Sequence, residues 1–397
     1  MWRVDDSIGA RIAAYRKRKG MTQALLAGLV GRSESWLSQV ERGARDVDRL
    51  SVLLRLAELL NVTVEMLTGK AAPARDSATA PALLDGVRAA LTRYDRLATA
   101  PTRLPPFPQL RALVVETHRA YQSARYAQTA RMLPAVLAGV DAYQDASRPV
   151  QVTRSSAYAV AAKLLTKVGD ADLAWVAADR AATAALAAES LPAEGLAAYQ
   201  VTCALLRAGH GDRAEQVAVG AAERLMRRVG EDNPELLSLT GALWLIAAVI
   251  AARHADRPTM TDRFTRAAKL AETLGIDANH GHSAFGPTNV VLHRVSAAVR
   301  MGDPLRVLSA AATVNTNALP VALNGRRASL HLDLATAQAQ RRHDPEAVFH
   351  LIEAERIAPE LLRYYVTAHV IIRDLLRRER RAQTPALRPL AARAGVL

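Results

Sequence analysis

The chain has 397 residues, too many for one ordinary compact core, so we expect at least two domains or one domain followed by an elongated repeat array. Its single cysteine, Cys203, excludes a secreted scaffold held together by internal disulfides. The N-terminus lacks the apolar stretch of a secretory signal, and no apolar run reaches the roughly 20 residues of a membrane-spanning helix. We therefore expect a cytoplasmic protein with no membrane partner.

The net charge of +14 is spread unevenly along the chain. Residues 1–70 carry 12 basic and 8 acidic side chains, whereas residues 109–397 carry 35 and 27. The net positive charge per residue of the first segment is therefore about twice that of the second. A mildly positive surface alone is a weak indication of nucleic-acid binding, because a GC-rich genome also favours Arg and Ala throughout a protein.

Residues 22–43 (TQALLAGLVGRSESWLSQVERG) have the spacing of two short helices that cross closely. Thr22 and Ser33 can each begin a helix by accepting hydrogen bonds from free backbone N–H groups. Gly31 stands where a tight turn needs a residue that tolerates positive φ, and Ala27 is small enough for the helices to cross closely. The segment therefore predicts a helix-turn-helix whose second helix presents polar side chains outward.

At these residues the chain resembles the lambda-repressor-like, or XRE, family of bacterial transcriptional regulators. The resemblance covers residues 8–67, and the Gln, Ala, Gly, Leu and Val-Glu-Arg-Gly positions of the family occur in register. One departure is the segment at residues 45–48 (RDVD), where many relatives have a proline before the fourth helix. The resemblance implies a five-helix DNA-binding domain, which we place at residues 1–70.

In that family, the start of the first motif helix contacts a phosphate, the second helix approaches base edges, and the residue after its terminal Glu contacts the DNA backbone. With one basic residue that precedes the motif, the implied DNA-binding residues are Arg16, Gln23, Ser33, Glu34, Ser35, Ser38, Gln39 and Arg42. The Gln39 amide can pair with adenine, and the Glu34 carboxylate can accept from cytosine. For Glu34, interaction with the dipole of its own helix is an equally open alternative.

Proline and small residues cluster at residues 71–81 and 99–108 and forbid a helix interior there. We predict a linker over residues 71–108 that contains one short helix at residues 83–97. Residues 109–397 show apolar positions at helical spacing and no credible alternating strand. The predicted fold class is all-α.

Interruptions of the helical pattern recur in this last segment at intervals of 42, 44, 47 and 41 residues. Each pairs a residue that leaves the helix with an Asp that can cap the next one. They fall at Gly169-Asp170, Gly211-Asp212, Ala255-Asp256, Gly302-Asp303 and His343-Asp344, with a weaker copy at Arg125-Tyr126. The helices expected after the five main interruptions span residues 171–188, 213–228, 261–274, 305–315 and 346–357.

These breaks, followed by small residues, resemble tetratricopeptide repeats, although the period is longer than that family's usual 34 residues. One helical pair cannot bury its own apolar face, so neighbouring pairs must stack. We therefore predict a tetratricopeptide-like α-solenoid over residues 109–397, with residues 361–381 as its polar cap.

Residues 280–294 (HGHSAFGPTNVVLHR) interrupt the repeat pattern with a loop that leads into a helix. Polar side chains follow at helical spacing on that helix and on the first helix of the next pair. With one aromatic residue of the loop they form a candidate effector-binding set: Phe285, Asn289, His293, Asn324, Arg327 and His331. Such residues can hold a peptide or a small polar ligand on the concave face of a solenoid. An unused, solvated groove is the equally open alternative.

Signals for catalysis are weak. The GxGxxA pattern at residues 209–214 follows a helix instead of a strand, which argues against dinucleotide binding. His280, His282 and His293 have no carboxylate or cysteine at metal-binding spacing. We predict no enzyme activity, no cofactor and no metal.

Together these features predict a sequence-specific DNA-binding transcriptional regulator. The resemblance to regulators that sense quorum peptides implies a homodimer on double-stranded DNA with a two-fold operator. It also implies that residues 109–397 mediate dimerisation and bind a peptide or small-molecule effector. The alternative is a DNA-tethered protein-docking platform without a small effector.

Overall fold

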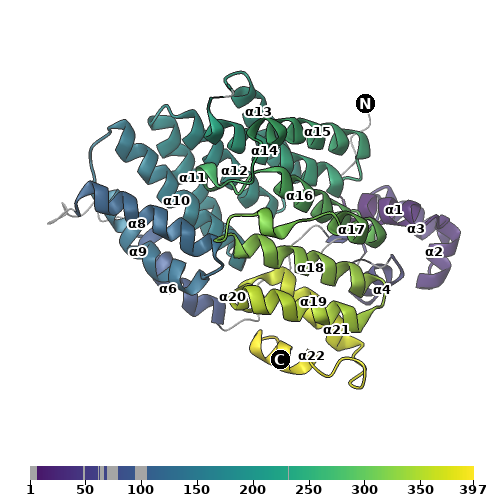
Figure 1. Cartoon of the computed structure of the whole chain (residues 1–397). Coiled ribbons are helices and arrows are strands. Elements are labelled where there is room, and N and C mark those ends of the chain that lie inside the picture. Colours follow the sequence, from purple (N-terminus) through teal and green to yellow (C-terminus); the bar gives the residue numbers. More distant parts are fainter. Residues whose placement is uncertain are drawn as a thin grey trace.

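The computed structural model describes residues 7–47, 50–60, 62, 67–68, 79–93, 105–230 and 232–397. All regular elements within these ranges are helical, which confirms the predicted all-α class (Figure 1). The N-terminal helices, here called the head, are α1 (Ile8–Arg18), α2 (Gln23–Val30), α3 (Glu34–Glu41) and α4 (Leu50–Leu60). The fifth helix that the resemblance implies falls on residues 61–70, most of which lie outside the described ranges.

The helices beyond the head form a stack of pairs (Figure 1). They are α6 (Thr79–Leu91), α8 (Phe107–Gln122), α9 (Tyr126–Ala142), α10 (Arg148–Val168), α11 (Ala171–Ala187), α12 (Leu191–Arg207), α13 (Gly211–Met226), α14 (Pro234–Arg253), α15 (Arg257–Leu274), α16 (Pro287–Arg300), α17 (Pro304–Ala311), α18 (Asn324–Gln340), α19 (Asp344–Ile357), α20 (Pro359–Tyr364), α21 (Val366–Arg377) and α22 (Leu387–Arg393). The short 3-10 helices η1 (His280–His282) and η2 (Thr316–Ala318) lie in the loops before α16 and α18. The helices of a pair pack on each other, and each pair packs on the next, as expected for a solenoid.

Three of the predicted breaks have the expected geometry in full. In each, a residue with positive φ ends one helix, and the side chain of the following Asp accepts a backbone hydrogen bond of 3.1 Å at the start of the next. These pairs are Gly169-Asp170, Ala255-Asp256 and Gly302-Asp303. Local capping therefore accounts for the ends of α10, α14 and α16.

Two predicted breaks were misplaced. Gly209, with φ of 86°, ends α12, so Gly211 and Asp212 already belong to the first turn of α13. Arg342, with φ of 61°, follows α18, and Asp344 is the first helical residue of α19 instead of its cap. In both cases an earlier residue takes the left-handed conformation. The helix predicted at residues 305–315 is also too long, because α17 ends at Ala311.

The two ends of the repeat region also differ from the prediction. The short linker helix is α6, and its buried Leu84, Val87 and Leu91 share one apolar core with helices of the repeat region. The predicted polar cap at residues 361–381 is divided into α20 and α21, and α22 follows with Leu387 and Leu390 buried. Both α6 and α22 therefore belong to the packed repeat structure.

The helix α14 contains the longest apolar run of the sequence. By length and composition it could cross a membrane, yet 83% of its most apolar window is buried among the described residues. It packs against α12, α13, α15 and α16. The prediction of a buried helix at this run is confirmed.

The head packs against the end of α16. The Tyr15 hydroxyl donates a hydrogen bond of 2.8 Å to the Arg300 carbonyl, and the Arg18 guanidinium donates to the Met301 carbonyl. Gly302 lies beside the Tyr15 ring, and a Cβ added there would make ordinary van der Waals contact with the ring at 3.5 Å. The capped break between α16 and α17 thus also forms the contact surface for α1.

Phe285 lies in the core, where Gly241 of α14 makes room for its ring. A Cβ at Gly241 would lie 2.0 Å from the Phe285 ring, which is fully buried. We expect Gly241→Ala to lower the free energy of unfolding by about 1–3 kcal/mol, because the inserted methyl overpacks the core. Urea denaturation followed by circular dichroism measures the change.

The matched control is Gly220→Ala on α13, where an added Cβ meets nothing within 4 Å. There the same substitution should be neutral or raise the free energy of unfolding by up to about 1 kcal/mol. Equal effects of the two variants would contradict the close packing of Phe285 on Gly241.

Candidate nucleic-acid interface

The helices α2 and α3 are joined by a tight, capped turn. The Thr22 hydroxyl accepts from the Leu25 N–H at 3.1 Å, and the Ser33 hydroxyl accepts from the Trp36 N–H at 3.1 Å. Gly31 ends α2 with φ of 71°, in the left-handed region that favours glycine. The local geometry expected from residues 22–43 is therefore present, with both caps and the turn at the predicted positions.

Packing fixes the second helix of this motif. Ala27, Leu37 and Val40 are buried in the core of the head. On the other side, Gly9 of α1 lies so close that an added Cβ would come 1.8 Å from the Val40 carbonyl oxygen. Because α3 is held between α1 and α2, its outward residues have fixed positions relative to the domain.

The polar residues predicted to read DNA lie along the outer side of α3. Ser33, Glu34 and Ser35 at its N-terminus are exposed, and Ser38 and Gln39 are half-buried. Arg42, which follows the helix, is exposed, and its Nε donates to the Ser38 carbonyl at 3.2 Å. These six side chains therefore occur together on one short helix, as direct base readout requires.

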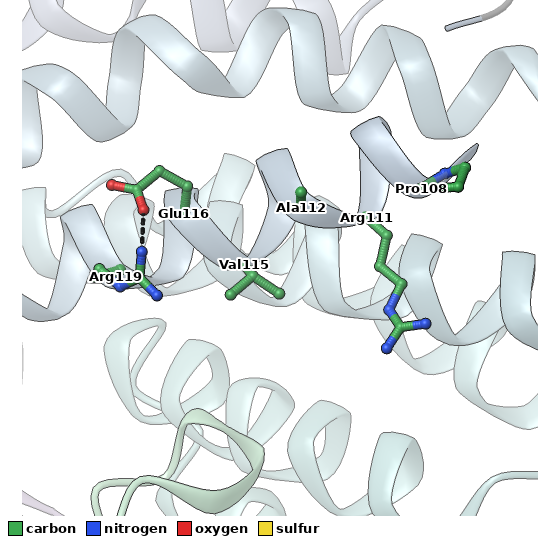
Figure 2. A pocket seen from close by; sticks show the side chains of 6 residues that line it. All are labelled: Pro108, Arg111, Ala112, Val115, Glu116 and Arg119. Carbon is green, nitrogen blue, oxygen red and sulfur yellow. Dashed lines mark hydrogen bonds and ion pairs between the residues drawn. The ribbon is translucent and has the colours of Figure 1, made fainter. Parts of the chain in front are cut away.

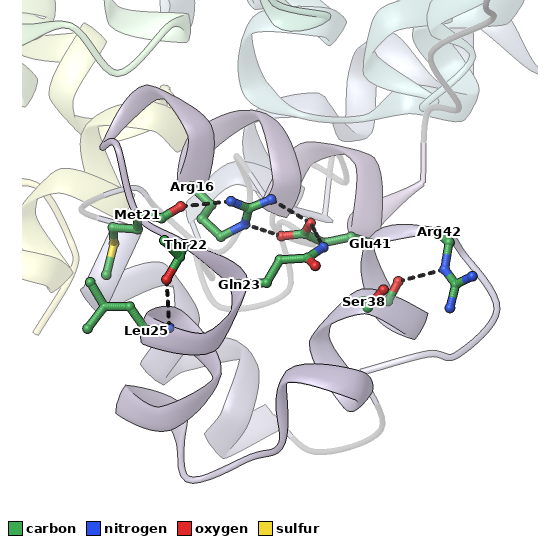
Figure 3. Close-up of polar contacts among 8 residues, drawn as sticks. All are labelled: Arg16, Met21, Thr22, Gln23, Leu25, Ser38, Glu41 and Arg42. Carbon is green, nitrogen blue, oxygen red and sulfur yellow. Dashed lines mark hydrogen bonds and ion pairs between the residues drawn. The ribbon is translucent and has the colours of Figure 1, made fainter.

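Arg16 and Gln23 instead converge on Glu41 at the end of α3 (Figure 3). The Arg16 guanidinium forms two hydrogen bonds to the Glu41 carboxylate, of 2.6 and 2.8 Å, and a third of 2.7 Å to the Met21 carbonyl. The Gln23 amide donates to the same carboxylate at 2.7 Å. The hydrogen bonds to Glu41 raise the pKa of Arg16, and both members of this ion pair are buried.

This arrangement corrects the role predicted for Arg16. Its side chain is enclosed by its protein partners, so it holds α1, α2 and α3 together instead of contacting a phosphate. Gln23 uses one amide N–H for Glu41, and its amide carries a second N–H, so its predicted phosphate contact stays a prediction. The sequence does not reveal this role, because the pairing of Arg16 with Glu41 depends on tertiary packing.

Other basic side chains of the head lie in the turn before α3 and at the end of α1. Arg32 in the turn is exposed, and its guanidinium lies 5.7 Å from the centre of the Trp36 ring. Lys17 is also exposed, whereas Lys19 donates to the Leu59 carbonyl at 2.9 Å. Arg32 is a candidate phosphate contact that the sequence reasoning missed, although its place just before the second motif helix was a usable signal.

The candidate effector residues divide into two groups. Phe285, Asn289 and His293 come from the loop before α16 and from α16 itself, and all are buried. The His293 Nδ1 lies 2.9 Å from the Asn289 carbonyl oxygen, and burial lowers the pKa of His293 to about 3. Phe285 fills the core, which corrects its predicted ligand role.

The other three residues, on α18, face the neighbouring loop and α19. The Arg327 guanidinium donates to the carbonyls of Leu319 at 2.7 Å and Val321 at 2.9 Å, and so clamps the loop after η2. Asn324 lies beside it, with its Oδ1 3.5 Å from the same guanidinium. His331 faces His350 of α19, with 3.3 Å between ring nitrogens. Arg327 and His331 thus have hydrogen-bond partners within the protein, and effector binding by these three residues stays a prediction.

A shallow depression lies on the outer face of α8 (Figure 2). Its lining comes from that helix alone: Pro108, Arg111, Ala112, Val115, Glu116 and Arg119. Glu116 and Arg119 form an ion pair across one end. Because a single helix supplies all of the lining, the depression cannot enclose a ligand.

Comparison with known proteins identifies the head. Residues 7–68 match the model of a helix-turn-helix domain. The prediction of this motif is therefore confirmed by sequence similarity as well as by geometry. No curated protein matches the chain in sequence.

The whole chain is similar in fold to a solved structure, that of a Rap protein complexed with Competence and Sporulation Factor. The TM-score is 0.51 and the sequence identity 14%, over 89% of this chain and 98% of that chain. At this identity the similarity concerns the fold, and it supports the helical repeat architecture. PlcR of Bacillus thuringiensis, in complex with the peptide PapR7 and DNA, is 12% identical over 89% of this chain and 94% of that chain, with a TM-score of 0.30.

Replacing Arg16 tests its structural role. In Arg16→Met, the buried Glu41 carboxylate loses its charged partner, and we expect the head to become less stable by about 3–5 kcal/mol. Hydrogen exchange of peptides from residues 8–41, read by mass spectrometry, reports this change within the head. Lys17→Met is the matched control, because Lys17 is exposed on the same helix. Unchanged exchange in Arg16→Met would show that Arg16 is free for another role.

Proposed function

We propose that this protein is a sequence-specific DNA-binding transcriptional regulator. The observation that carries the proposal is the row of accessible polar side chains on α3, the second helix of a helix-turn-helix domain. In such motifs the second helix enters the major groove, where side-chain amides, carboxylates and hydroxyls distinguish base pairs.

Within this proposal, the residues have different tasks. Gln39 pairs with adenine through its amide, while Ser33, Glu34, Ser35 and Ser38 contact base edges or nearby phosphates. The phosphate contacts come from Gln23, Arg32 and Arg42, which flank α3. Arg16 supports them indirectly, because its ion pair fixes the end of α3.

The XRE resemblance leads us to propose a bacterial, cytoplasmic homodimer that binds a two-fold operator. Residues 1–70 are the DNA-binding domain, residues 71–108 lead from it, and residues 109–397 bind an effector and mediate dimerisation. Within residues 71–108, α6 packs in the repeat core. An effector acts by binding one arrangement of the dimer more tightly than another.

The operator is found by selection from random duplex DNA with the full chain, and the proposal predicts an enriched sequence with two-fold symmetry. On that duplex, Gln39→Ala should reduce discrimination against a changed base pair by about 1–3 kcal/mol. Arg42→Ala should instead weaken binding to all sequences and reduce the slope of log affinity against log salt by about one.

Fluorescence anisotropy at several salt concentrations measures both effects. Lys269→Ala, on α15 far along the chain from the head, is the control and should behave as the unmodified protein. Selection without sequence enrichment, or identical specificity in Gln39→Ala, would refute base readout by α3.

The oligomeric state is a separate prediction. Sedimentation equilibrium of the full chain should give twice the chain mass of 42.7 kDa at micromolar concentration. A monomer that binds only one half of the selected operator would contradict the homodimer while leaving DNA binding by the head intact.

A further inference from the structure

The first helices of the repeat pairs form a closed ring. In order, α8, α10, α12, α14, α16 and α18 each contact the next, and α18 contacts α8 again. The Ser123 hydroxyl at the end of α8 donates to the Ala322 carbonyl just before α18, at 3.2 Å, where the ring closes. One side of each of these helices therefore faces the centre of the ring, which is called its interior below.

Charged side chains from helices that are not neighbours in the ring lie within electrostatic reach of one another. Arg326 of α18 interacts with Lys163 of α10 and with Tyr199 and Cys203 of α12, although neither helix is adjacent to α18 in the ring. Every ring helix after α8 contributes at least one such cation. These residues, here called the ring cations, are Lys163, Lys167, Arg207, Arg253, Arg300 and Arg326.

Negative charge is scarce around the ring cations. No carboxylate in the described part of the chain forms an ion pair with any of the six. Asp333 lies within electrostatic reach of Lys167 and Arg300. Burial raises the pKa of Asp333 to about 7, which weakens it as a counter-charge near neutral pH. Burial, and then the positive charge of Arg326, lower the pKa of Lys163 to about 7.

Two of the ring cations each have a guanidinium nitrogen without a hydrogen-bond partner. The Nε atoms of Arg253 and Arg300 are buried without a hydrogen-bond acceptor. Buried cations without counter-charge are costly, and a bound anion would relieve that cost. The cluster is therefore electrostatically suited to an anionic ligand.

Asn289 adds a second, independent feature. Its side chain is 1% exposed, and neither its amide nitrogen nor its amide oxygen has a hydrogen-bond partner. Along α16, helical periodicity places Asn289, His293 and Arg300 on one face, and His293 lies within electrostatic reach of Arg326. A buried donor and acceptor side by side match the C=O and N–H of a peptide group.

We propose that the interior of this ring binds a peptide rich in aspartate and glutamate. The proposal rests on the proposed function, because it names the effector class of the regulator. The peptide carboxylates pair with the ring cations, and the Asn289 amide pairs with a peptide group of the backbone.

The distribution of the ring cations favours a peptide over a single small anion. They lie on five helices, and the axes of packed helices are about 8–10 Å apart, so one phosphate or carboxylate cannot reach them all. An extended chain with several carboxylates can. Tyrosines add apolar contact area between the charges, as where the Lys167 Nζ lies 4.1 Å from the centre of the Tyr365 ring.

The first experiment uses the unmodified full chain and a random heptapeptide mixture. Bound peptides are separated from free ones by gel filtration and sequenced by mass spectrometry. We expect Asp and Glu to be enriched, and Lys and Arg depleted, relative to the starting mixture. Absence of enrichment, or enrichment of basic peptides, would overturn the proposal.

The second experiment measures dissociation constants by calorimetry for one enriched acidic peptide. The comparison peptide has the same sequence with Asn and Gln in place of Asp and Glu. We expect this amide version to bind at least about tenfold more weakly, which corresponds to the loss of one charge-assisted hydrogen bond. Inorganic phosphate is the small-anion arm. Equal binding of the amide version, or phosphate binding as tight as that of the peptide, would refute an acidic peptide as the ligand.

Variants locate the site. The double variant Arg253→Gln, Arg326→Gln should weaken binding of the acidic peptide about tenfold or more and reduce its salt dependence. The double variant Arg227→Gln, Arg228→Gln removes the same charge from exposed positions after α13 and should bind like the unmodified chain. Equal losses in both variants would show general attraction to a positive protein and would overturn the assigned site.

Circular dichroism confirms that both variants fold, and the amide-peptide comparison needs no variant at all. None of these measurements uses DNA. A chain that binds acidic peptides but no duplex would refute the proposed function alone, whereas a chain that binds duplex but no acidic peptide would refute the ring site alone.

Discussion

Close contact between alanine-rich helix faces is the constraint on which the repeat structure depends. The helices α10 and α11 meet through fully buried alanines, among them Ala157, Ala161, Ala174, Ala177 and Ala181. Small side chains let helix axes approach closely, but they bury little apolar area in each contact. Stability therefore comes from stacking many pairs, and stacking gives every first helix one neighbour on each side. That regular neighbour pattern is what allows α8 and α18 to meet and the ring to close.

Closure of the helix ring places basic side chains in two different environments. Arginines on the outer surface, such as Arg266 on α15 and Arg356 on α19, pair with nearby acids in exposed ion pairs that contribute little to stability. The ring cations form no ion pair with a carboxylate in the described part of the chain, and burial weakens the ionisation of nearby Asp333. Electrostatic interactions are less screened at buried positions. A basic side chain of this protein is therefore paired with an acid on the outer surface but has no such partner among the ring cations.

Sequence reasoning succeeded where the cause is local. The caps at Thr22, Ser33 and Asp170 follow from a hydroxyl or carboxylate beside free N–H groups, so neighbouring residues determine them. The break predicted at Gly211 was wrong because Gly209, two residues earlier, takes the left-handed conformation that ends α12. The helix-turn-helix was recognised because its caps, turn and apolar positions all agree.

The sequence did not predict the contacts of side chains whose direction depends on helix rotation or on residues far along the chain. One residue turns a helix by about 100°, so Arg326 faces the ring while Arg327 clamps a loop on another side. Arg16 was assigned to DNA because its pairing with Glu41 joins two separate helices. Ring closure itself brings together segments about two hundred residues apart, which no local pattern reports.

The end of α16 belongs to both halves of the molecule. The Arg300 side chain is one of the ring cations, while its backbone carbonyl accepts the Tyr15 hydroxyl of the head. A ligand that shifts this residue would therefore change the free energy with which the head is held. Thermodynamic linkage makes the effect reciprocal, so DNA that repositions the head would change ligand affinity by the same factor. If the proposed ring site and the proposed DNA binding both hold, the ring would bind its ligand with one affinity in the DNA-bound protein and another in the DNA-free protein.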